Sequence, residues 1–548
     1  MTSLELGPVL RHVGTTTATI WVETSERCTV EVLGASAPTF QVCGQHYALV
    51  VVDGLEPGTV RPYEVRLDGE LVWPIEGTST PPSYLRTRRE RTDEPETGRL
   101  RFVFGSCRYP PTDDPELEAS LGIDALDAFA TRLMDEVTAA DDPATVLPDA
   151  LCLLGDQVYA DEITPRTERW IRANRDPDAE DGPGLEIANY GEYAHLYSES
   201  WTDRELRWLL STVPTAMIFD DHDVRDDWNT SQTWREQMAA KPWWPQRIRA
   251  GLASYWVYQH LGNLDPESRD ADPLYRKVLE ADGDVFAMLA DFAARADAEV
   301  GEPTGVRWSY RWDLGRTRLL MVDSRCARVL NAENRLMIND HSFAWIEENA
   351  SSPDEEVDHL LLGSSIPWLM PPAVSHVQSL DEWAASRGSK LAETVRQAVD
   401  LEHWPAFRAS FDRLADLVRG VASGPSAPAT VCVLSGDVHH SYAAEARYPS
   451  PTRSRVYQLT CSPVRNGVPW FMEYVFALGW WRGLTNALGR VARAAGIGDL
   501  PLSWSTIGGP WFGNAVSTLE VSGRDARVRV ERSGSRGGLE AVAELPLT

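Results

Sequence analysis

The chain has almost no lysine, no paired cysteine motif and no long apolar run. Only Lys241, Lys277 and Lys390 are lysines among 52 basic residues, so arginine carries nearly all of the positive charge. The seven cysteines are scattered without a CxxC pair, which argues against a secreted disulfide scaffold. No apolar stretch reaches membrane-spanning length, and the start of the chain does not resemble a signal peptide. These absences predict a reduced, cytoplasmic protein without a transmembrane segment.

The charge balance excludes one class of partner. The formal net charge is -29, and a surface that acidic repels phosphate backbones, so we expect no nucleic-acid partner. An anionic ester as substrate would need local positive charge from arginine or from metal ions. With 548 residues the chain is too long for one ordinary core, and two or more domains are expected.

Residues 1–82 are predicted to form an all-β domain. Short stretches rich in β-branched residues alternate with turns such as Asp53-Gly54 and Asp68-Gly69. The stretch 55–63 is similar to the turn-and-tyrosine segment of fibronectin-like sandwiches, which predicts a small β-sandwich. Residues 83–99 are polar, charged and proline-bearing, a composition typical of a linker.

A different pattern fills residues 100–548. Short apolar runs without alternation recur, as expected for strands buried on both faces, and helical stretches such as 123–139 and 406–421 separate them. This pattern predicts a layered α/β domain. Residues 224–317 are interpreted as a mostly helical insertion and residues 467–548 as a C-terminal extension. Its Trp-rich segment 469–496 is expected to pack against the domain, with peripheral membrane contact as the alternative.

Four of the apolar runs end in chemically reactive residues. Several carboxylates crowded after a buried strand repel one another, and proteins tolerate this mainly around cations. Histidine beside a carboxylate is a common transition-metal ligand. We expect these four strand ends to lie at the same edge of one sheet, and together they predict a metal centre. The four segments are Gly105-Ser106-Cys107-Arg108, Gly155-Asp156-Gln157-Val158-Tyr159-Ala160-Asp161, Asp220-Asp221-His222-Asp223, and Gly436-Asp437-Val438-His439-His440.

Together these blocks resemble the calcineurin-like metallophosphoesterase superfamily, and within it the PhoD-like alkaline phosphatase family. The resemblance spans roughly residues 100–466. The family's usual first block, Asp-x-His, is replaced by Gly105-Ser106-Cys107, a departure that the PhoD-like branch shares. The resemblance implies a four-layer αββα metallophosphoesterase sandwich, preceded by the fibronectin-like all-β domain.

The resemblance also implies roles for particular residues. Asp156 would bridge two metals, one of them Fe³⁺ held by Cys107, Tyr159 and His439. Asp221 and Asp437 would make the second position all oxygen, which favours Ca²⁺, with other divalent metals as alternatives. Further oxygen ligands or supporting contacts are expected from Asp223, Asp226, Asp227 and Asn229.

His222 takes the place of the family's catalytic histidine, and Arg108 is a candidate phosphate clamp. The superfamily has one more histidine between its third and last blocks, but no histidine of this sequence in that interval sits in a clear motif. We therefore assign the role of that additional histidine to none of the five histidines in the interval, His260, His341, His359, His376 and His403.

The predicted function is a metal-dependent phosphoester hydrolase, a phosphatase that attacks a small-molecule phosphoester with a metal-activated water. Monoester and diester substrates, including phospholipids, both stay open. The alternative from another class is a non-catalytic protein that keeps the metal and uses it for binding or sensing. A zinc hydrolase of the metallo-β-lactamase type is excluded because the sequence has no H-x-H-x-D run.

Overall fold

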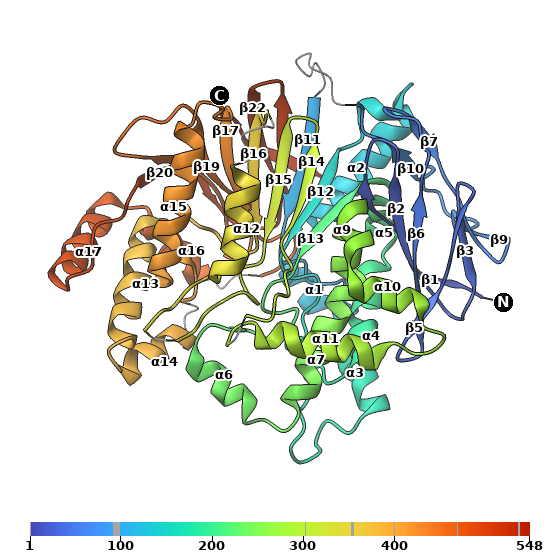
Figure 1. Cartoon of the computed structure of the whole chain (residues 1–548), viewed down its shortest axis with the longest axis horizontal. Helices are drawn as coiled ribbons and strands as arrows, with labels where there is room; N and C mark the ends of the chain where they lie inside the picture. The colour runs from blue at the N-terminus through green and yellow to red at the C-terminus, as the bar shows by residue number, and fades with distance from the viewer. Residues whose placement is uncertain are drawn as a thin grey trace.

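Two facing β-sheets form the centre of the molecule, and helices cover their outer faces (Figure 1). The computed structural model describes residues 2–90, 99–301, 303–331, 333–351, 356–398, 401–467, 470–534 and 537–548. The six-stranded sheet has the order β13-β12-β11-β21-β22-β23, and the seven-stranded sheet has the order β14-β15-β16-β17-β19-β18-β20. Their bounds are Arg99–Gly105 (β11), Ala150–Leu154 (β12), Thr215–Ile218 (β13), Tyr310–Leu314 (β14), Thr317–Val322 (β15), His359–Ser364 (β16), Thr430–Ser435 (β17), Ser441–Arg447 (β18), Arg455–Thr460 (β19), Ser503–Trp511 (β20), Ala515–Ser522 (β21), Asp525–Ser533 (β22) and Leu539–Pro546 (β23).

The core between the sheets explains why the apolar runs do not alternate. Phe104 of β11 and Leu154 of β12 share one buried cluster with Leu361 of β16 and Leu434 of β17. Neighbouring residues on the same strands, such as Leu153, face the other way and pack beneath helices. A strand buried on both faces is apolar at successive positions. The four-layer αββα sandwich predicted from the sequence is confirmed.

Helices close the sandwich on both sides. Two of them, α2 (Ala125–Ala139) and α5 (Arg204–Thr212), pack on the six-stranded sheet, and each begins after an aspartate N-cap, Asp124 and Asp203. On the other side α12 (Asp340–Ala350) and α15 (Arg408–Ser423) pack on the seven-stranded sheet. The predicted helices at 123–139 and 406–421 correspond to α2 and α15 within about two residues.

The C-terminal segment is part of the central sandwich rather than an appendage to it. After α16 (Trp470–Gly479) and α17 (Arg482–Ala494), β20 joins the edge of the seven-stranded sheet, and β21 pairs antiparallel with β11 in the middle of the six-stranded sheet. The alternating strands after residue 502 gave no hint of their partners, because strand pairing is decided across hundreds of residues. No helix in the described part of the chain is long and apolar enough to cross a membrane.

The N-terminal region is all β, as predicted. Its strands form two four-stranded sheets and one short pair, β7 with β10. Because β10 lies at 84–86, the sandwich continues into the expected linker, of which residues 91–98 lie outside the described residues. The strands are Leu4–Val13 (β1), Ala18–Thr24 (β2), Thr29–Val32 (β3), Ala35–Pro38 (β4), Phe40–Val42 (β5), Gln45–Val52 (β6), Val60–Pro62 (β7), Val65–Leu67 (β8), Glu70–Trp73 (β9) and Tyr84–Arg86 (β10).

Further helices surround the lower half of the molecule as drawn in Figure 1. Residues 224–317, interpreted as a helical insertion, hold α6 to α11. The bounds are Pro115–Leu121 (α1), Pro165–Asn174 (α3), Tyr190–Trp201 (α4), Gln232–Ala239 (α6), Trp244–Tyr255 (α7), Leu261–Asn263 (α8), Pro266–Ala271 (α9), Pro273–Glu280 (α10), Phe286–Ala298 (α11), Pro372–Ala385 (α13) and Lys390–Ala398 (α14).

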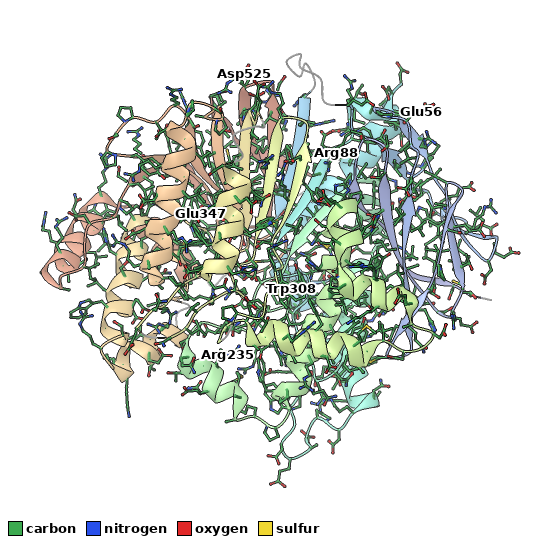
Figure 2. All side chains as sticks on the ribbon, viewed as in Figure 1. Glu56, Arg88, Arg235, Trp308, Glu347 and Asp525 are labelled. Atoms are coloured by element: carbon green, nitrogen blue, oxygen red, sulfur yellow. The ribbon has the colours of Figure 1, made fainter. Side chains whose placement is uncertain are left out.

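The β-sandwich is joined to the insertion by buried polar contacts at a π-helical turn, Trp256–His260. The hydroxyls of Tyr47 and Tyr258 lie 2.8 Å apart, and Tyr258 donates to Glu23 Oε2 at 3.0 Å. Arg11 of β1 donates to the Gln259 carbonyl at 2.5 Å. A further link lies higher in Figure 2, where Arg88 is labelled and donates to the carbonyl of Asp313.

Candidate metal centre

The four reactive segments meet, but they come from two sheets rather than one. Those after β11, β12 and β13 leave the six-stranded sheet, and the segment after β17 leaves the seven-stranded sheet. The expectation of a single sheet edge was wrong, because the sandwich brings the strand ends of two facing sheets together. The Asp437 backbone N–H, for example, donates to Ser106 Oγ across the interface between the sheets at 3.0 Å.

The backbone at this junction is tightly packed and locally strained. A Cβ added to Gly436 would lie 2.0 Å from Ser106 Oγ and 2.7 Å from the Leu154 carbonyl, so only glycine fits there. Cys107, Asp437 and His439 all adopt positive φ angles of 57°, 66° and 49°. Such conformations cost about 1–3 kcal/mol each and gather at functional sites, where the surrounding structure enforces them.

Three buried carboxylates form the centre of the site. One oxygen from each of Asp156, Asp220 and Asp221 lies within 4.8 Å of the others. Asp156 Oδ1 and Asp220 Oδ2 are buried and have no hydrogen-bond partner among the described residues. Burial raises the pKa of Asp156 well above its usual range; His222 opposes this shift, and the neighbouring carboxylates add to it. Burial likewise raises the pKa of Asp220 and of Asp221.

This donor set fits a cation. Buried carboxylate oxygens without a donor are costly when ionised, and a bound cation removes that cost. The residues present, an all-oxygen cluster of three aspartates, are the ligand type that hard cations prefer. A second group of possible ligands, formed by Asp221, His222 and Asp226, shares Asp221 with the first. The site therefore has room for more than one ligand arrangement around Asp221.

Arg325 supplies positive charge behind the cluster. It follows β15, and its Nε donates to Asp220 Oδ1 at 2.5 Å while its Nη2 lies 3.1 Å from Asp221 Oδ1. Its Nη1 contacts Glu402 at 2.6 Å, and Arg328 binds the same carboxylate at 2.9 Å. Sequence reasoning missed Arg325, although it stands three residues after a buried strand, the same signal that pointed to the other four segments.

His222 is held by a carboxylate that the sequence reasoning left without a role. Its Nδ1 lies 2.9 Å from Asp161 Oδ1, and its Nε2 lies 3.9 Å from Asp226 Oδ1. Burial lowers the pKa of His222, but the carboxylates of Asp161 and of Asp221 outweigh burial and raise that pKa well above its usual value. Burial would raise the pKa of Asp161, but His222 lowers it to about 2. Both shifts favour a protonated His222 paired with an ionised Asp161.

Cys107 and Tyr159 lie near Asp156, and the ring of Tyr159 is 5.1 Å from that of His222 between centroids. Burial, and then the charges of Asp156 and Asp437, raises the pKa of the Cys107 thiol well above its usual value. Burial, and then the charges of Cys107 and Asp156, does the same to the pKa of Tyr159. The Tyr159 hydroxyl accepts a hydrogen bond from Asn466 Nδ2 at 3.0 Å. Cys107, Tyr159, Asp156 and Asp437 are thus close enough to shift one another's pKa values. An ionised Cys107 or Tyr159 therefore requires a cation nearby.

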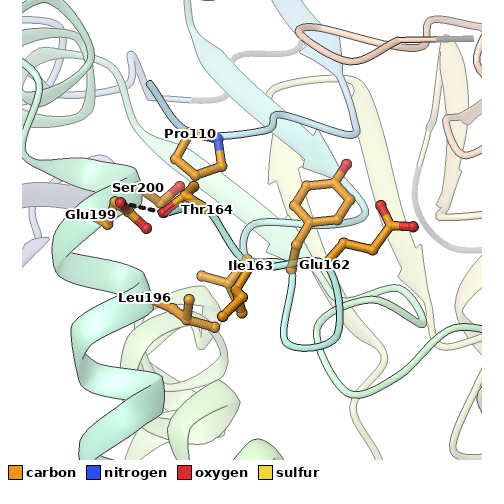
Figure 3. Close-up of a pocket in the computed structure, with 9 residues that line it drawn as sticks. Pro110, Glu162, Ile163, Thr164, Leu196, Glu199 and Ser200 are labelled. Carbon is orange, nitrogen blue, oxygen red and sulfur yellow. Dashed lines mark hydrogen bonds between the residues drawn. The ribbon is translucent and has the colours of Figure 1, made fainter. Parts of the chain in front are cut away.

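A small hollow beside Tyr159 supports its loop (Figure 3). It lies between the segment after β12 and helix α4. Glu199 on α4 accepts hydrogen bonds from Thr164 at 2.7 Å and from Thr167 at 2.6 Å. Because the Glu199 carboxylate is already satisfied by these two threonines, it holds the loop against α4. Glu162 is the other charged residue that lines the hollow.

Asp437 is oriented by a histidine far away in sequence. His403 Nε2 lies 2.9 Å from Asp437 Oδ2, and Gln378 Nε2 contacts the other ring nitrogen of His403 at 2.8 Å. Burial would raise the pKa of Asp437, but the hydrogen bond from His403 lowers it to about 2. Burial lowers the pKa of His439, which leaves a neutral imidazole suited to metal binding.

Asp223 ties the loops together. Its Oδ2 accepts from the Asp220 backbone N–H at 3.0 Å, and its Oδ1 accepts from those of Gln157 and Val158, both at 3.3 Å. Gln259 of the π-helical turn also donates to Oδ1 at 3.3 Å. Asp223 therefore holds the segments after β12 and β13 in one register. Of the other aspartates considered, Asp227 donates its backbone N–H to Asp221 Oδ2 at 3.0 Å.

Arg108 points away from the carboxylate cluster. Its guanidinium is buried and bonds Asp124 at 2.7 Å, Asp203 at 2.5 Å and Asp127 at 3.2 Å. Asp124 and Asp203 are the N-caps of α2 and α5, so Arg108 fastens two helix starts behind the site. Its Nε and both Nη atoms are engaged with these carboxylates and with the Ser200 carbonyl, so we do not retain Arg108 as a clamp.

The chain is similar to known proteins in both of its parts. A family model described as PhoD-like phosphatase matches residues 135–474, and a domain of unknown function, DUF7800, matches residues 1–85. A solved structure described as "Structure of PhoD" covers 99% of this chain and 92% of its own, with a TM-score of 0.56 and 12% identity, which supports the fold alone. A solved maltogenic amylase from S. marinus, aligned over 97% of this chain and 77% of its own at 8% identity, has a TM-score of only 0.15, which is too low to indicate a shared fold. A search of curated proteins gives no match.

Fold and site together define a phosphatase-type hydrolase with acidic groups that could hold metal ions. Because the PhoD-like model covers more than half of the sequence, the chain belongs to the PhoD-like phosphatase family. It is therefore an enzyme of the alkaline phosphatase type, and members of this family depend on metal ions.

Proposed function

We propose that this enzyme hydrolyses small-molecule phosphoesters at a cation site centred on Asp156, Asp220 and Asp221. One observation carries the proposal: the three carboxylates are buried with oxygens within 4.8 Å of one another, and Asp156 Oδ1 and Asp220 Oδ2 lack a hydrogen-bond partner among the described residues. Asp220 was not among the ligands expected from the sequence and is added here. Phosphomonoesters and phosphodiesters both fit this chemistry.

The two ends of the cluster suit different cations. Cys107, Tyr159 and His439 offer a thiol, a phenol and a neutral imidazole, which suit a transition metal, and Fe³⁺ is proposed there with Asp156. Asp221 and Asp437 offer only oxygen, and Ca²⁺ is proposed beside them, with other divalent metals as alternatives. A thiolate ligand persists in a reducing compartment, so a cytoplasmic location belongs to the same proposal.

The protein's own groups position the substrate and move a proton. When bound, the cations lower the pKa of a water and offset charge on the phosphoryl oxygens. His222, protonated because Asp161 faces its Nδ1, can donate a proton from Nε2 to the leaving oxygen. His403 and Arg325 keep Asp437, Asp220 and Asp221 in place.

The cation assignment is tested by elemental analysis and a visible spectrum of the purified enzyme. We expect iron with a tyrosinate-to-metal absorption band that disappears in Tyr159→Phe. Tyr109→Phe is the matched control, because Tyr109 is also buried and its ring lies 5.3 Å from that of Tyr159. A band that survives in Tyr159→Phe, or enzyme that is active with zinc alone, would refute the iron assignment.

The reaction is tested separately with p-nitrophenyl phosphate and bis-p-nitrophenyl phosphate. Turnover that is lost in Asp156→Asn, with the melting temperature retained, is the expected result for either ester, and the ratio of the two rates assigns the preferred class. Fully metal-loaded enzyme that turns over neither ester would contradict hydrolysis and favour the binding or sensing alternative.

A further inference from the structure

Helix α16 is apolar on two opposite faces, and only one of them is covered. On the inner face, the ring of Phe476 stacks on that of His440 at 4.2 Å between centroids, and Trp480 contacts Tyr442 at 5.2 Å. A Cβ on Gly479 would lie 2.8 Å from Pro371, so this face also packs closely against the start of α13. A helix that is apolar all round is normally buried on all sides.

The outer face of α16 is exposed instead. Tyr474, Val475, Leu478 and Trp481 are 66%, 48%, 53% and 62% exposed. Val475, Leu478 and Trp481 follow Tyr474 by one, four and seven residues, a spacing that places all four along one side of the helix. The first three lie within α16, and Trp481 comes just after its end. We call these four residues the apolar stripe. Large exposed aromatic and aliphatic side chains in a row mark an interaction surface rather than ordinary scattered exposure.

Basic residues follow the apolar stripe along the chain, on α17. Helical spacing places Arg482, Arg490 and Arg493 on one side of α17, which begins directly after Trp481. Glu473 lies in the first turn of α16, and Asp499 pairs with Arg493 at 3.0 Å. Figure 1 shows α17 projecting at the edge of the molecule. This local excess of arginine stands out in a chain whose net charge is -29.

We propose that the apolar stripe and the α17 arginines dock on an anionic phospholipid surface. Tryptophan and tyrosine favour the boundary between lipid headgroups and acyl chains, and arginine favours anionic headgroups. At 0.1 M salt, charges beyond about 10 Å are screened, so these arginines act on the lipid while most of the acidic surface does not. A second copy of the chain fits less well, because a twofold contact through this face would bring like-charged arginines together.

This surface lies close to the candidate metal centre. Phe476 on the inner face of α16 touches His440, the residue after His439. Docking would therefore place the lipid surface one helix away from the site. The docking proposal does not depend on the hydrolytic one, because it rests on exposure and charge alone.

Co-sedimentation with lipid vesicles tests the proposal on the full-length enzyme. Vesicles of phosphatidylcholine with 30–40% phosphatidylglycerol, a composition of roughly physiological anionic charge, are compared with pure phosphatidylcholine. We expect binding to the anionic vesicles that weakens at high salt. Leu478→Glu with Trp481→Glu should weaken it at least about tenfold, and each of Arg482→Gln and Arg490→Gln about fivefold. Leu279→Glu on α10 is the matched control, since Leu279 is 49% exposed, and it should bind like the wild type.

The outcomes separate the possible occupants. Equal binding with and without phosphatidylglycerol, or binding unaffected by the Leu478 and Trp481 substitutions, would overturn the proposal. Concentration-dependent dimers in light scattering that the same substitutions abolish would assign the face to a second copy and overturn it as well. All substituted side chains are exposed, so the melting temperatures of the variants should match that of the wild type and show that loss of binding is not loss of fold.

Discussion

Replacing Glu23 by glutamine tests the junction between the β-sandwich and the π-helical turn. Glu23 lies on β2, is 6% exposed, and accepts a hydrogen bond from the Tyr258 hydroxyl at 3.0 Å. Burial, which outweighs this hydrogen bond, raises the pKa of Glu23 from 4.5 to about 8. The carboxyl group is therefore neutral in the folded protein at neutral pH, whereas it is ionised in the unfolded chain.

The size of the effect follows from that shift. Because the pKa of the folded state is raised, the stability that the neutral carboxyl provides is complete below pH 4.5 and is lost as the pH rises through about 8. Each pKa unit corresponds to about 1.4 kcal/mol, so the loss by pH 8 is on the order of 4 kcal/mol. Glutamine keeps an oxygen that can accept from Tyr258 but does not ionise. Glu23→Gln should therefore stabilise the protein by about that amount near pH 8 and by much less near pH 4.5.

Thermal melting of the full-length enzyme at pH 5, 6.5 and 8 measures this difference. We expect the melting temperature of Glu23→Gln to exceed that of the wild type by several degrees at pH 8 and to approach it at pH 5. Glu26→Gln, three residues along the chain and exposed, is the control and should show no such trend. A difference that stays constant across the three pH values would show that Glu23 does not titrate between them, and the reasoning from burial would fail.

Two further predictions concern the surroundings of the metal centre. Arg108→Met should lower the free energy of unfolding by about 3–5 kcal/mol, because it leaves buried carboxylates without their partner. Denaturant titration measures this loss, and steady-state kinetics should show an unchanged KM for the folded enzyme. A raised KM with normal stability would restore the phosphate-clamp role. His403→Ala should weaken metal binding about 10–100-fold, because Asp437 loses the histidine that orients it. Metal titration measures the affinity, and the control variant His376→Ala should bind metal normally. Equal affinities in the two variants would exclude positioning by His403.

Much of the fold followed from local pattern. Runs such as Leu151–Leu154 and Val431–Leu434 are apolar at every position because they are buried between a second sheet and a helix layer. The reactive residues directly after these strands could be recognised for the same reason: a polar residue that ends a buried run emerges at the strand tip. The local sequence pattern does not predict the number of sheets, because the pairing of each strand depends on contacts between residues that are distant in the sequence.

The supporting residues of the site were harder to recognise, for two different reasons. Arg325 and Asp161 lie in segments after buried strands and could have been found by the rule that identified Asp156. His403 could not, because it follows no strand and reaches Asp437 only through the packing of its loop against α13. Arg108 shows the opposite error. It follows a predicted ligand, but the positive φ of Cys107 turns the chain and the N-cap aspartates of α2 and α5 draw its guanidinium away.

The charge balance of the site explains how so acidic a chain can receive a phosphate group. The buried Arg325 is already engaged with Asp220, Asp221 and Glu402, and the buried Arg328 with Glu402. They offset charge behind the carboxylates, and His222 is the positively charged group that the site keeps for the substrate. Without cations, one imidazolium faces several carboxylates, so the site repels an anionic ester. Binding of cations and binding of substrate must then be linked, since the same positive charges that relieve the buried oxygens of Asp156 and Asp220 also attract the phosphoryl group.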